Sequence, residues 1–449
     1  MLLRSRVGPV AATALVTFVA LLAGAPASAP AAEKALWGPV TLPDGSSAFG
    51  LYEELGVDTL QFTLSWSHAA PTRPAAPTDP ADAAYRWPAE LATAAAEAAR
   101  RGIRLSLLVT GTPGWANGER DERWRPDRAQ DLGDFLTAAA RQYPAVRRWM
   151  IWGEPNRADR FRPNARNSAV GPRAYAILLD NAYAALKRAN RRNIVIGANT
   201  WTSGTVRPPT FLRQMRLPNG RRPRLDWLGH NPFPFRFPKI ADKPLAGGYR
   251  DISDADTMSR EARRAYGRTV PLWLSEYTIQ SDHGSAVFAS YVSRAVQARY
   301  VTAGFGLVDR LGSAVAGLGW VGLLDEPEAP GSANWGLMTY DLQRKPAFAA
   351  MRRAPSERLR PRITAARTIS RSGLRGRSGL QVAITPRASG AVVVELRRGS
   401  TLRARVRLAG RAGRRVTARL RSARATPGRH VVSVRAARGA TVRRAVRVR

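Results

Sequence analysis

Two glutamates in this chain of 449 residues stand where a carboxylate could take part in catalysis. Glu154 follows the apolar run 149–152, and Glu276 follows the apolar run 272–274. Each run is short enough to be a buried strand, so each glutamate would lie where a strand ends and a loop begins. Two carboxylates that face one cleft are the minimum needed to hydrolyse a glycosidic bond. One of them must keep its proton near neutral pH, in a less polar setting, while the other stays ionised.

A fold that would bring these two strand ends together is indicated between residue 34 and about residue 353. Eight apolar runs there predict buried strands, at 35–39, 59–66, 103–110, 148–152, 193–198, 225–230, 270–274 and 314–323. Helical patterns lie between them, at 88–101, 131–141, 174–190, 257–266 and 286–305. This alternation predicts a (β/α)8 TIM barrel, in which reactive groups lie at the carboxyl ends of the strands. A doubly wound open sheet is the alternative, but the glycine-rich first turn that usually accompanies it is missing.

The segments around both glutamates resemble those of clan A glycoside hydrolases, the retaining barrel enzymes, with cellulase-like and family 39-like members nearest. Residues 152–156 read Trp-Gly-Glu-Pro-Asn, and residues 273–277 read Trp-Leu-Ser-Glu-Tyr. Further support comes from the segments 112–116, 230–234 and 336–347, and the resemblance covers about residues 34–353. It implies a retaining double displacement with Glu154 as acid/base and Glu276 as nucleophile, about 5–5.5 Å apart. It also implies that no metal ion or organic cofactor is needed.

Three positions depart from the usual pattern of these enzymes. Gly153 stands where an Asn usually precedes the acid/base, Gln61 where the second strand commonly carries an Arg, and Phe233 where the sixth often has a Tyr. Because both carboxylates are present, an active hydrolase of an oligo- or polysaccharide remains the expectation. The alternatives are a non-catalytic carbohydrate-binding barrel and an envelope-attached binding protein that acts through a basic tail.

Further residues near the predicted strand ends are candidates for contacts with the sugar. Aromatic rings could stack on the apolar faces of sugar rings, and amide or imidazole groups could hydrogen-bond to hydroxyls. The predicted substrate-binding residues are Trp66, Trp115, Asn156, Asn199, His230, Phe233, Tyr277 and Trp320, with Trp201 as a further candidate platform. The alternative for each is a place in the packed core or in a turn.

Residues 1–32 predict a secretory signal peptide. Arg4 and Arg6 precede the apolar run 10–22, and small residues follow at 25–31. An uncleaved anchor helix is the alternative, but a span needs roughly 20 continuous apolar residues. The mature protein is therefore expected to have no transmembrane span and to be secreted or associated with the cell envelope. The lack of cysteine excludes a disulfide framework, a thiol nucleophile and Cys-ligated zinc.

Residues 362–449 predict a second domain, a small β-sandwich after a linker at 354–361. Apolar residues alternate with arginines at 402–408 and 416–421, and turn signals separate about seven strands. The segment 361–449 holds 24 Arg and a single acid, Glu395, so it carries +23 of the formal net charge of +38. Residues 361–449 contain no aromatic side chain that could stack on bases, which argues against nucleic acid as the partner of this segment. An anionic cell-surface polymer or an anionic lipid is a better candidate partner than nucleic acid. The interpretation that we favour is that the arginines only keep the small sheet soluble and its edges unpaired.

Overall fold

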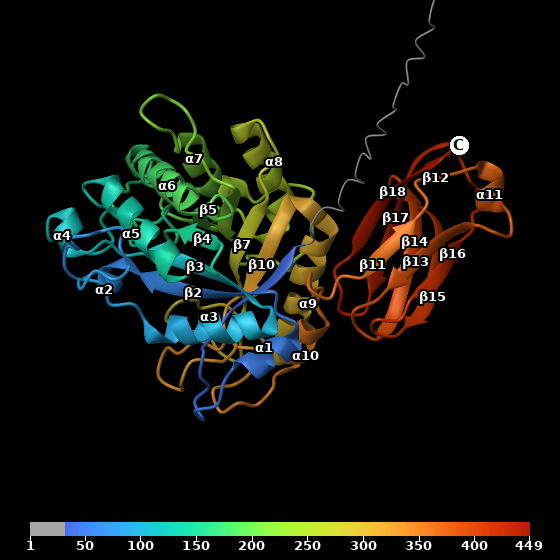
Figure 1. Ribbon diagram of the computed structural model, residues 1–449, viewed down its shortest axis with the longest axis horizontal. Helices are drawn as coiled ribbons and strands as arrows, with labels where there is room; N and C mark the ends of the chain where they lie inside the picture. Colours follow the sequence, from blue (N-terminus) through green and yellow to red (C-terminus); the bar gives the residue numbers. More distant parts are fainter. Residues whose placement is uncertain (1–31) are drawn as a thin grey trace, which may run out of the picture.

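A computed structural model describes residues 32–449, which form a barrel surrounded by helices and, beside it, a β-sandwich (Figure 1). The predicted signal peptide at 1–32 lies outside the described residues, apart from Ala32. Of the helices in the described part of the chain, none is both long and apolar enough to cross a membrane.

Eight parallel strands close the barrel and confirm the predicted TIM barrel. They are β1 (Glu33–Trp37), β2 (Thr59–Ser65), β3 (Arg104–Thr110), β4 (Arg148–Ile151), β5 (Ile194–Trp201), β6 (Trp227–Asn231), β7 (Leu272–Tyr277) and β10 (Val315–Trp320). Closure follows from β1, which pairs with both β2 and β10. The strands read as apolar runs because helices cover their outer side while side chains fill the interior. Glu154 therefore follows the fourth barrel strand, and Glu276 lies at the end of the seventh.

The helices around the barrel are α1 (Phe49–Leu55), α2 (Trp66–Ala69), α3 (Ala89–Arg101), α4 (Gly114–Asn117), α5 (Ala129–Gln142), α6 (Val170–Ala189), α7 (Pro208–Gln214), α8 (Ala255–Tyr266), α9 (Arg294–Leu311) and α10 (Pro346–Arg353). The largest difference from the predicted boundaries is in α9, which also extends to Leu311. The helix expected at 286–305 begins only at Arg294, because the Ser293 hydroxyl accepts a hydrogen bond from the Val296 N–H and caps it there. The residues before it form the short paired strands β8 (Gln280–Ser281) and β9 (Tyr291–Val292).

The C-terminal residues form the all-β structure that the sequence predicts. One sheet contains β11 (Arg362–Ala365), β13 (Leu380–Thr385) and β16 (Val416–Leu420). The other has the order β12 (Thr368–Ile369), β18 (Val442–Val448), β17 (Gly428–Ala436), β14 (Gly390–Arg398) and β15 (Thr401–Gly410). The short helix α11 (Arg371–Arg375) closes one end. Between the sheets lies an aliphatic core that is separate from the core of the barrel.

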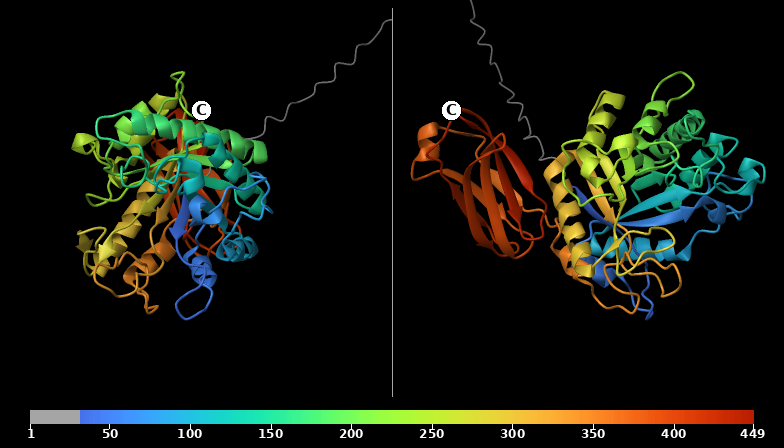
Figure 2. Two further views of the ribbon diagram at one scale, coloured as in Figure 1. Left: turned by 90° about the vertical axis from the view of Figure 1, so that its left-hand side faces the viewer. Right: turned by 180° about the vertical axis from the view of Figure 1, so that it is seen from behind.

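The sandwich lies against the side of the barrel formed by α9 and α10 (Figure 2). At the amino-terminal end of β2, the buried Asp58 accepts hydrogen bonds from Ser356 Oγ (2.9 Å) and from the N–H groups of Glu357 and Arg358 (both 2.8 Å). Ser356 in turn forms a β-bridge with Gly439 of the sandwich. The segment predicted as a linker is thus held between the two structures.

We expect Asp58→Ala to lower the free energy of unfolding by about 2–4 kcal/mol, because it leaves several buried donors without an acceptor. Urea denaturation followed by circular dichroism measures this loss. Asp44→Ala is the matched control, since Asp44 lies in an exposed turn. Equal stability of the two variants would contradict a structural role for Asp58.

Candidate active site

Glu154 is positioned by a sharp turn directly after β4. Trp152 and Glu154 have φ angles of 64° and 51°, in the left-handed region that few non-glycine residues occupy. Two hydrogen bonds to β5 hold this turn: Glu154 N–H donates to the Asn199 carbonyl (3.1 Å), and Asn199 Nδ2 donates to the Trp152 carbonyl (2.9 Å). Strained backbone persists where the surroundings fix it in this way, and it is common at active sites.

The carboxylate of Glu154 has a partner on each oxygen. Arg157 donates to Oε2 (2.7 Å), and Asn231 Nδ2 donates to Oε1 (3.1 Å). Arg157 also pairs with Asp159 (2.6 Å), and its guanidinium lies over the ring of Trp201 at 4.3 Å. Glu154 is only 8% exposed, so these contacts fix the orientation of a largely buried carboxylate.

Glu276, unlike Glu154, has no arginine paired with its carboxyl group among the described residues. Burial and the nearby charge of Glu154 raise its pKa to about 8, although Arg160, Asn231 and Arg157 act in the other direction. Among residues 32–449, no Lys or Arg forms an ion pair with it. At neutral pH, the carboxyl group of Glu276 therefore holds a proton.

Gln61, which stands where related barrels commonly carry an arginine, explains in part why no cation among the described residues pairs with Glu276. Gln61 Nε2 donates to the Ser275 carbonyl (2.8 Å), and its Oε1 accepts from Trp273 Nε1 (3.0 Å). Gln61 thus joins β2 to β7 inside the barrel and brings no charge to Glu276. Phe233, with no hydroxyl, brings no hydrogen bond either.

Asn231, at the end of β6, is a site residue that the sequence analysis did not single out. Ser275 Oγ donates to Asn231 Oδ1 (2.6 Å), which turns the amide so that Nδ2 faces Glu154. Asn231 also lowers the pKa of Glu276, so its amide lies near both carboxyl groups. Its signal in the sequence was its place at the end of the sixth predicted strand.

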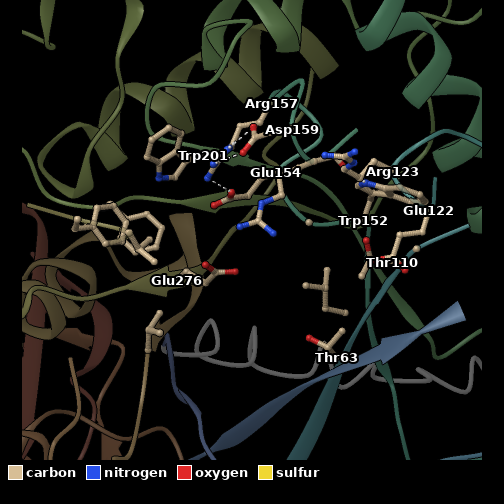
Figure 3. A pocket seen from close by; sticks show the side chains of 18 of the residues that line it. Thr63, Thr110, Glu122, Arg123, Trp152, Glu154, Arg157, Asp159, Trp201 and Glu276 are labelled. Carbon is tan, nitrogen blue, oxygen red and sulfur yellow. Dashed lines mark hydrogen bonds and ion pairs between the residues drawn. The ribbon is translucent and has the colours of Figure 1, made fainter. Parts of the chain in front are cut away.

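Both glutamates open into one cleft, and Figure 3 shows their carboxyl groups pointing into the same space. The cleft has a volume of about 490 Å³, within the range of about 300–1,000 Å³ typical of small-molecule sites. Besides the two glutamates, it is lined by Thr63, Leu108, Thr110, Gly111, Glu122, Arg123, Trp152, Gly153, Arg157, Asp159, Arg160, Trp201, Phe233, Val287, Phe288, Val321 and Trp335. The three arginines and Trp335 lie in loops. Loops have no periodic pattern from which the direction of a side chain could be predicted, so the sequence analysis did not identify these residues.

Of the predicted substrate-binding residues, the structure brings Phe233 to the cleft, together with the further candidate Trp201. It does not bring Trp66 or Trp115 there. Trp66 is buried with its ring edge-on to that of Trp115, at 5.8 Å. Trp115 Nε1 donates to the Ala70 carbonyl (2.8 Å), and Arg73 covers its ring. These two rings pack beside the barrel mouth rather than inside it.

Tyr277 and Trp320 are also buried away from the cleft and touch each other edge-on at 5.5 Å. The Tyr277 hydroxyl donates to the Tyr300 carbonyl (2.8 Å), so the ring packs against α9. Trp320 Nε1 donates to the carbonyl of Trp335 (2.9 Å). Trp320 therefore supports a residue that lines the cleft without lining it itself.

The predicted polar contacts Asn156, Asn199 and His230 are buried and hold backbone in place. Asn156 accepts from the Trp201 N–H (2.8 Å) and donates to the Trp201 carbonyl (3.0 Å). Asn199 holds the turn that carries Glu154, as described above. His230 contacts the Thr200 hydroxyl and the Arg250 carbonyl, and burial lowers its pKa to about 4, so it is neutral at physiological pH.

Comparison with known proteins agrees with this architecture. No protein-family model and no curated protein sequence matches the chain. A solved structure of a family 39 glycoside hydrolase from the gut symbiont Bacteroides cellulosilyticus WH2 matches with a TM-score of 0.58 and 14% identity, over 87% of this chain and 81% of that chain. A glucosidase from Croceicoccus marinus matches with a TM-score of 0.51 and 14% identity, over 94% of each chain. The predicted resemblance to family 39-like barrels is thus confirmed at the level of the fold.

Proposed function

We propose that this chain is a secreted, retaining glycoside hydrolase that cleaves O-glycosidic bonds of an oligo- or polysaccharide. One observation carries the proposal: Glu154, directly after the fourth strand, and Glu276, at the end of the seventh, point into one cleft, and the charge of Glu154 helps to raise the pKa of Glu276. That is the equipment of glycoside hydrolysis by two carboxyl groups. The fold shared with a family 39 glycoside hydrolase supports the same reaction class.

In the proposed reaction, Glu276 attacks the anomeric carbon while Glu154 protonates the departing glycosidic oxygen. Water, deprotonated by Glu154, then attacks the anomeric carbon and releases Glu276. Since Glu276 holds the proton in the free chain, that proton has to pass to Glu154 before the attack. Asn231 donates to Glu154 Oε1 (3.1 Å) and lowers the pKa of Glu276, so its amide lies beside the path of this transfer.

A panel of chromogenic glycosides, together with plant and microbial polysaccharides, tests the proposal. The configuration of the first-formed product is followed by NMR. Hydrolysis with retained anomeric configuration is expected, and inversion would contradict the double displacement. Binding of sugars without turnover of any member would instead favour a non-catalytic carbohydrate-binding barrel.

We expect kcat/KM to follow a bell-shaped pH profile whose upper limb lies near pH 8. Above that pH Glu276 loses the proton that, in the proposed reaction, passes to Glu154 and then to the leaving group. The measurement is kcat/KM for one chromogenic glycoside between pH 4 and pH 10, at constant ionic strength. A plateau that extends past pH 9.5 would contradict the role of the Glu276 proton in the reaction.

The outer face of the five-stranded sheet supports a second proposal, that the sandwich binds an anionic polymer of the cell surface. Arg429 lies directly opposite Arg447 on the neighbouring strand, and Arg435 and Arg407 flank Val393 on both sides. All four arginines are exposed. Like charges placed opposite each other destabilise a sheet, so a polyanion would relieve a repulsion built into this face.

Binding to polygalacturonate beads tests the second proposal, with neutral dextran beads as reference. The triple variant Arg429→Gln, Arg435→Gln, Arg447→Gln is expected to bind about tenfold more weakly at low salt. A triple Gln variant at Arg188, Arg191 and Arg192, which are exposed on the barrel, removes the same charge elsewhere. Equal loss in both triple variants would mean that total charge, and not this face, governs binding.

A further inference from the structure

We propose that the cleft accepts a sugar that carries a carboxylate, a uronic acid residue, and that Arg160 binds this carboxylate. The inference rests on the proposed glycosidase function and names its substrate class. It follows from which charged groups along the cleft have partners among the described residues 32–449 and from the one arginine that has none there.

Two of the arginines along the cleft are already engaged. Arg157 donates to Glu154 (2.7 Å) and to Asp159 (2.6 Å). Arg123 forms an ion pair with Asp121 at 2.8 Å. Neither guanidinium could turn to a ligand without exposing a carboxylate that it now neutralises.

Arg160 differs from both. Arg160 is exposed and lines the cleft, and its guanidinium has no hydrogen bond or ion pair with any residue of 32–449. Its backbone is nevertheless fixed, because its N–H donates to the Arg157 carbonyl (3.2 Å) and its carbonyl accepts from Trp152 Nε1 (2.9 Å). Its charge also lowers the pKa of Glu276, so the free guanidinium lies close to the reacting groups. The backbone of Arg160 is thus fixed against the turn that carries Glu154, while the charge of its guanidinium has no partner among the described residues.

Neither of the other two acidic residues that line the cleft, Glu122 and Asp159, forms an ion pair with Arg160. Glu122 accepts a hydrogen bond from Ser67 Oγ (2.6 Å), and Asp159 is held by Arg157. Arg160 acts on Asp159 through charge alone, since no ion pair joins them.

A neutral sugar entering the cleft would strip water from the Arg160 guanidinium and offer only hydroxyls in return, which is costly for a charged group. A carboxylate offers two oxygens in the plane of the guanidinium, the geometry of the strongest charge-assisted pairs. The cleft therefore favours a ring with a carboxylate over the same ring with a hydroxymethyl group.

Matched aryl glycosides that differ only at carbon 6 test the inference: glucuronide against glucoside, and galacturonide against galactoside. The wild-type chain is expected to prefer the uronide of at least one pair. Arg160→Gln is expected to lower kcat/KM for that uronide by about 100-fold, mainly through KM, and to change neutral substrates less than threefold. Arg166→Gln is the control, because Arg166 is exposed in the same loop region and does not line the cleft.

The outcomes separate this inference from the proposed function. Hydrolysis of neutral glycosides at least as fast as uronides, with equal effects of Arg160→Gln on both, would overturn the inference and leave the glycosidase intact. Preference for a 6-sulfated glycoside over the uronide would overturn the carboxylate as the ligand. If no glycoside is cleaved, titration calorimetry with free glucuronate and galacturonate still decides, because binding by wild type that Arg160→Gln abolishes supports the site and its absence refutes it.

Discussion

Replacement of Glu276 by glutamine is expected to lower kcat by at least about 1,000-fold on any substrate that the wild-type chain cleaves. The amide keeps the size of the side chain and removes the group that would attack the anomeric carbon. Glu276 is the only carboxyl group that β7 contributes to the described cleft. No neighbouring group can therefore replace it as the nucleophile. Single-turnover measurements with an activated aryl glycoside detect the residual rate.

The same substitution should make the protein more stable. Glu276 titrates near pH 8 in the folded chain and near pH 4.5 in an unfolded one. Between these values the unfolded state binds fewer protons, so the stability of the wild type falls as pH rises. Glutamine has no such dependence, and we expect Glu276→Gln to gain about 1–3 kcal/mol over wild type at pH 8 and less at pH 5. Thermal unfolding at both pH values measures the difference.

Glu328→Gln serves as the control, because Glu328 is exposed in the loop after β10 and does not line the cleft. The roles of the two glutamates are separated by adding azide to glycine variants. Azide should give a glycosyl azide of inverted configuration with Glu276→Gly and of retained configuration with Glu154→Gly. The reverse pattern would mean that the two glutamates have the opposite roles to those that the resemblance implies. Near-normal turnover by either Gln variant would contradict the hydrolase proposal.

Replacement of Asn231 by aspartate is the second large expected effect, a loss of about 100-fold or more in kcat/KM. It removes the amide N–H that faces Glu154 Oε1 and places a third carboxyl group against the pair. Repulsion among three acids raises their pKa values, so the upper limb of the pH profile should move to higher pH as well.

The matched comparison is Ser275→Ala, which removes only the hydroxyl that orients the Asn231 amide. It is expected to lower kcat/KM by about tenfold with no shift of the pH profile. If Asn231→Asp and Ser275→Ala behave alike, Asn231 would be a structural residue of β6 and not part of the carboxyl pair.

The barrel and the positions of its two glutamates could be predicted from the sequence because they follow from periodicity. Eight apolar runs separated by amphipathic helices leave few other folds, and a residue directly after such a run must lie at the barrel mouth. The β-sandwich followed in the same way from the alternation of apolar residues and arginines.

The sugar-contact residues could not be predicted in this way, because position along a strand does not fix the direction of a side chain. Successive residues of a strand point to opposite sides, so when Glu276 faces the cleft, Tyr277 packs outward against α9. Asn156 lies in the loop after β4 and Asn199 near the end of β5, but their amides bind backbone groups of Trp152 and Trp201 and not a cleft. Buried backbone needs such partners before any ligand does.

The sequence by itself determined the architecture and the presence of two acids at opposed strand ends, because local periodicity and strand order encode both. Only the tertiary structure decided that the pKa of Glu276 is raised and that Arg160, among the described residues, has no partner for its guanidinium. Those properties depend on burial and on distances between groups far apart in the chain, such as Glu154 and Glu276, which no local pattern records.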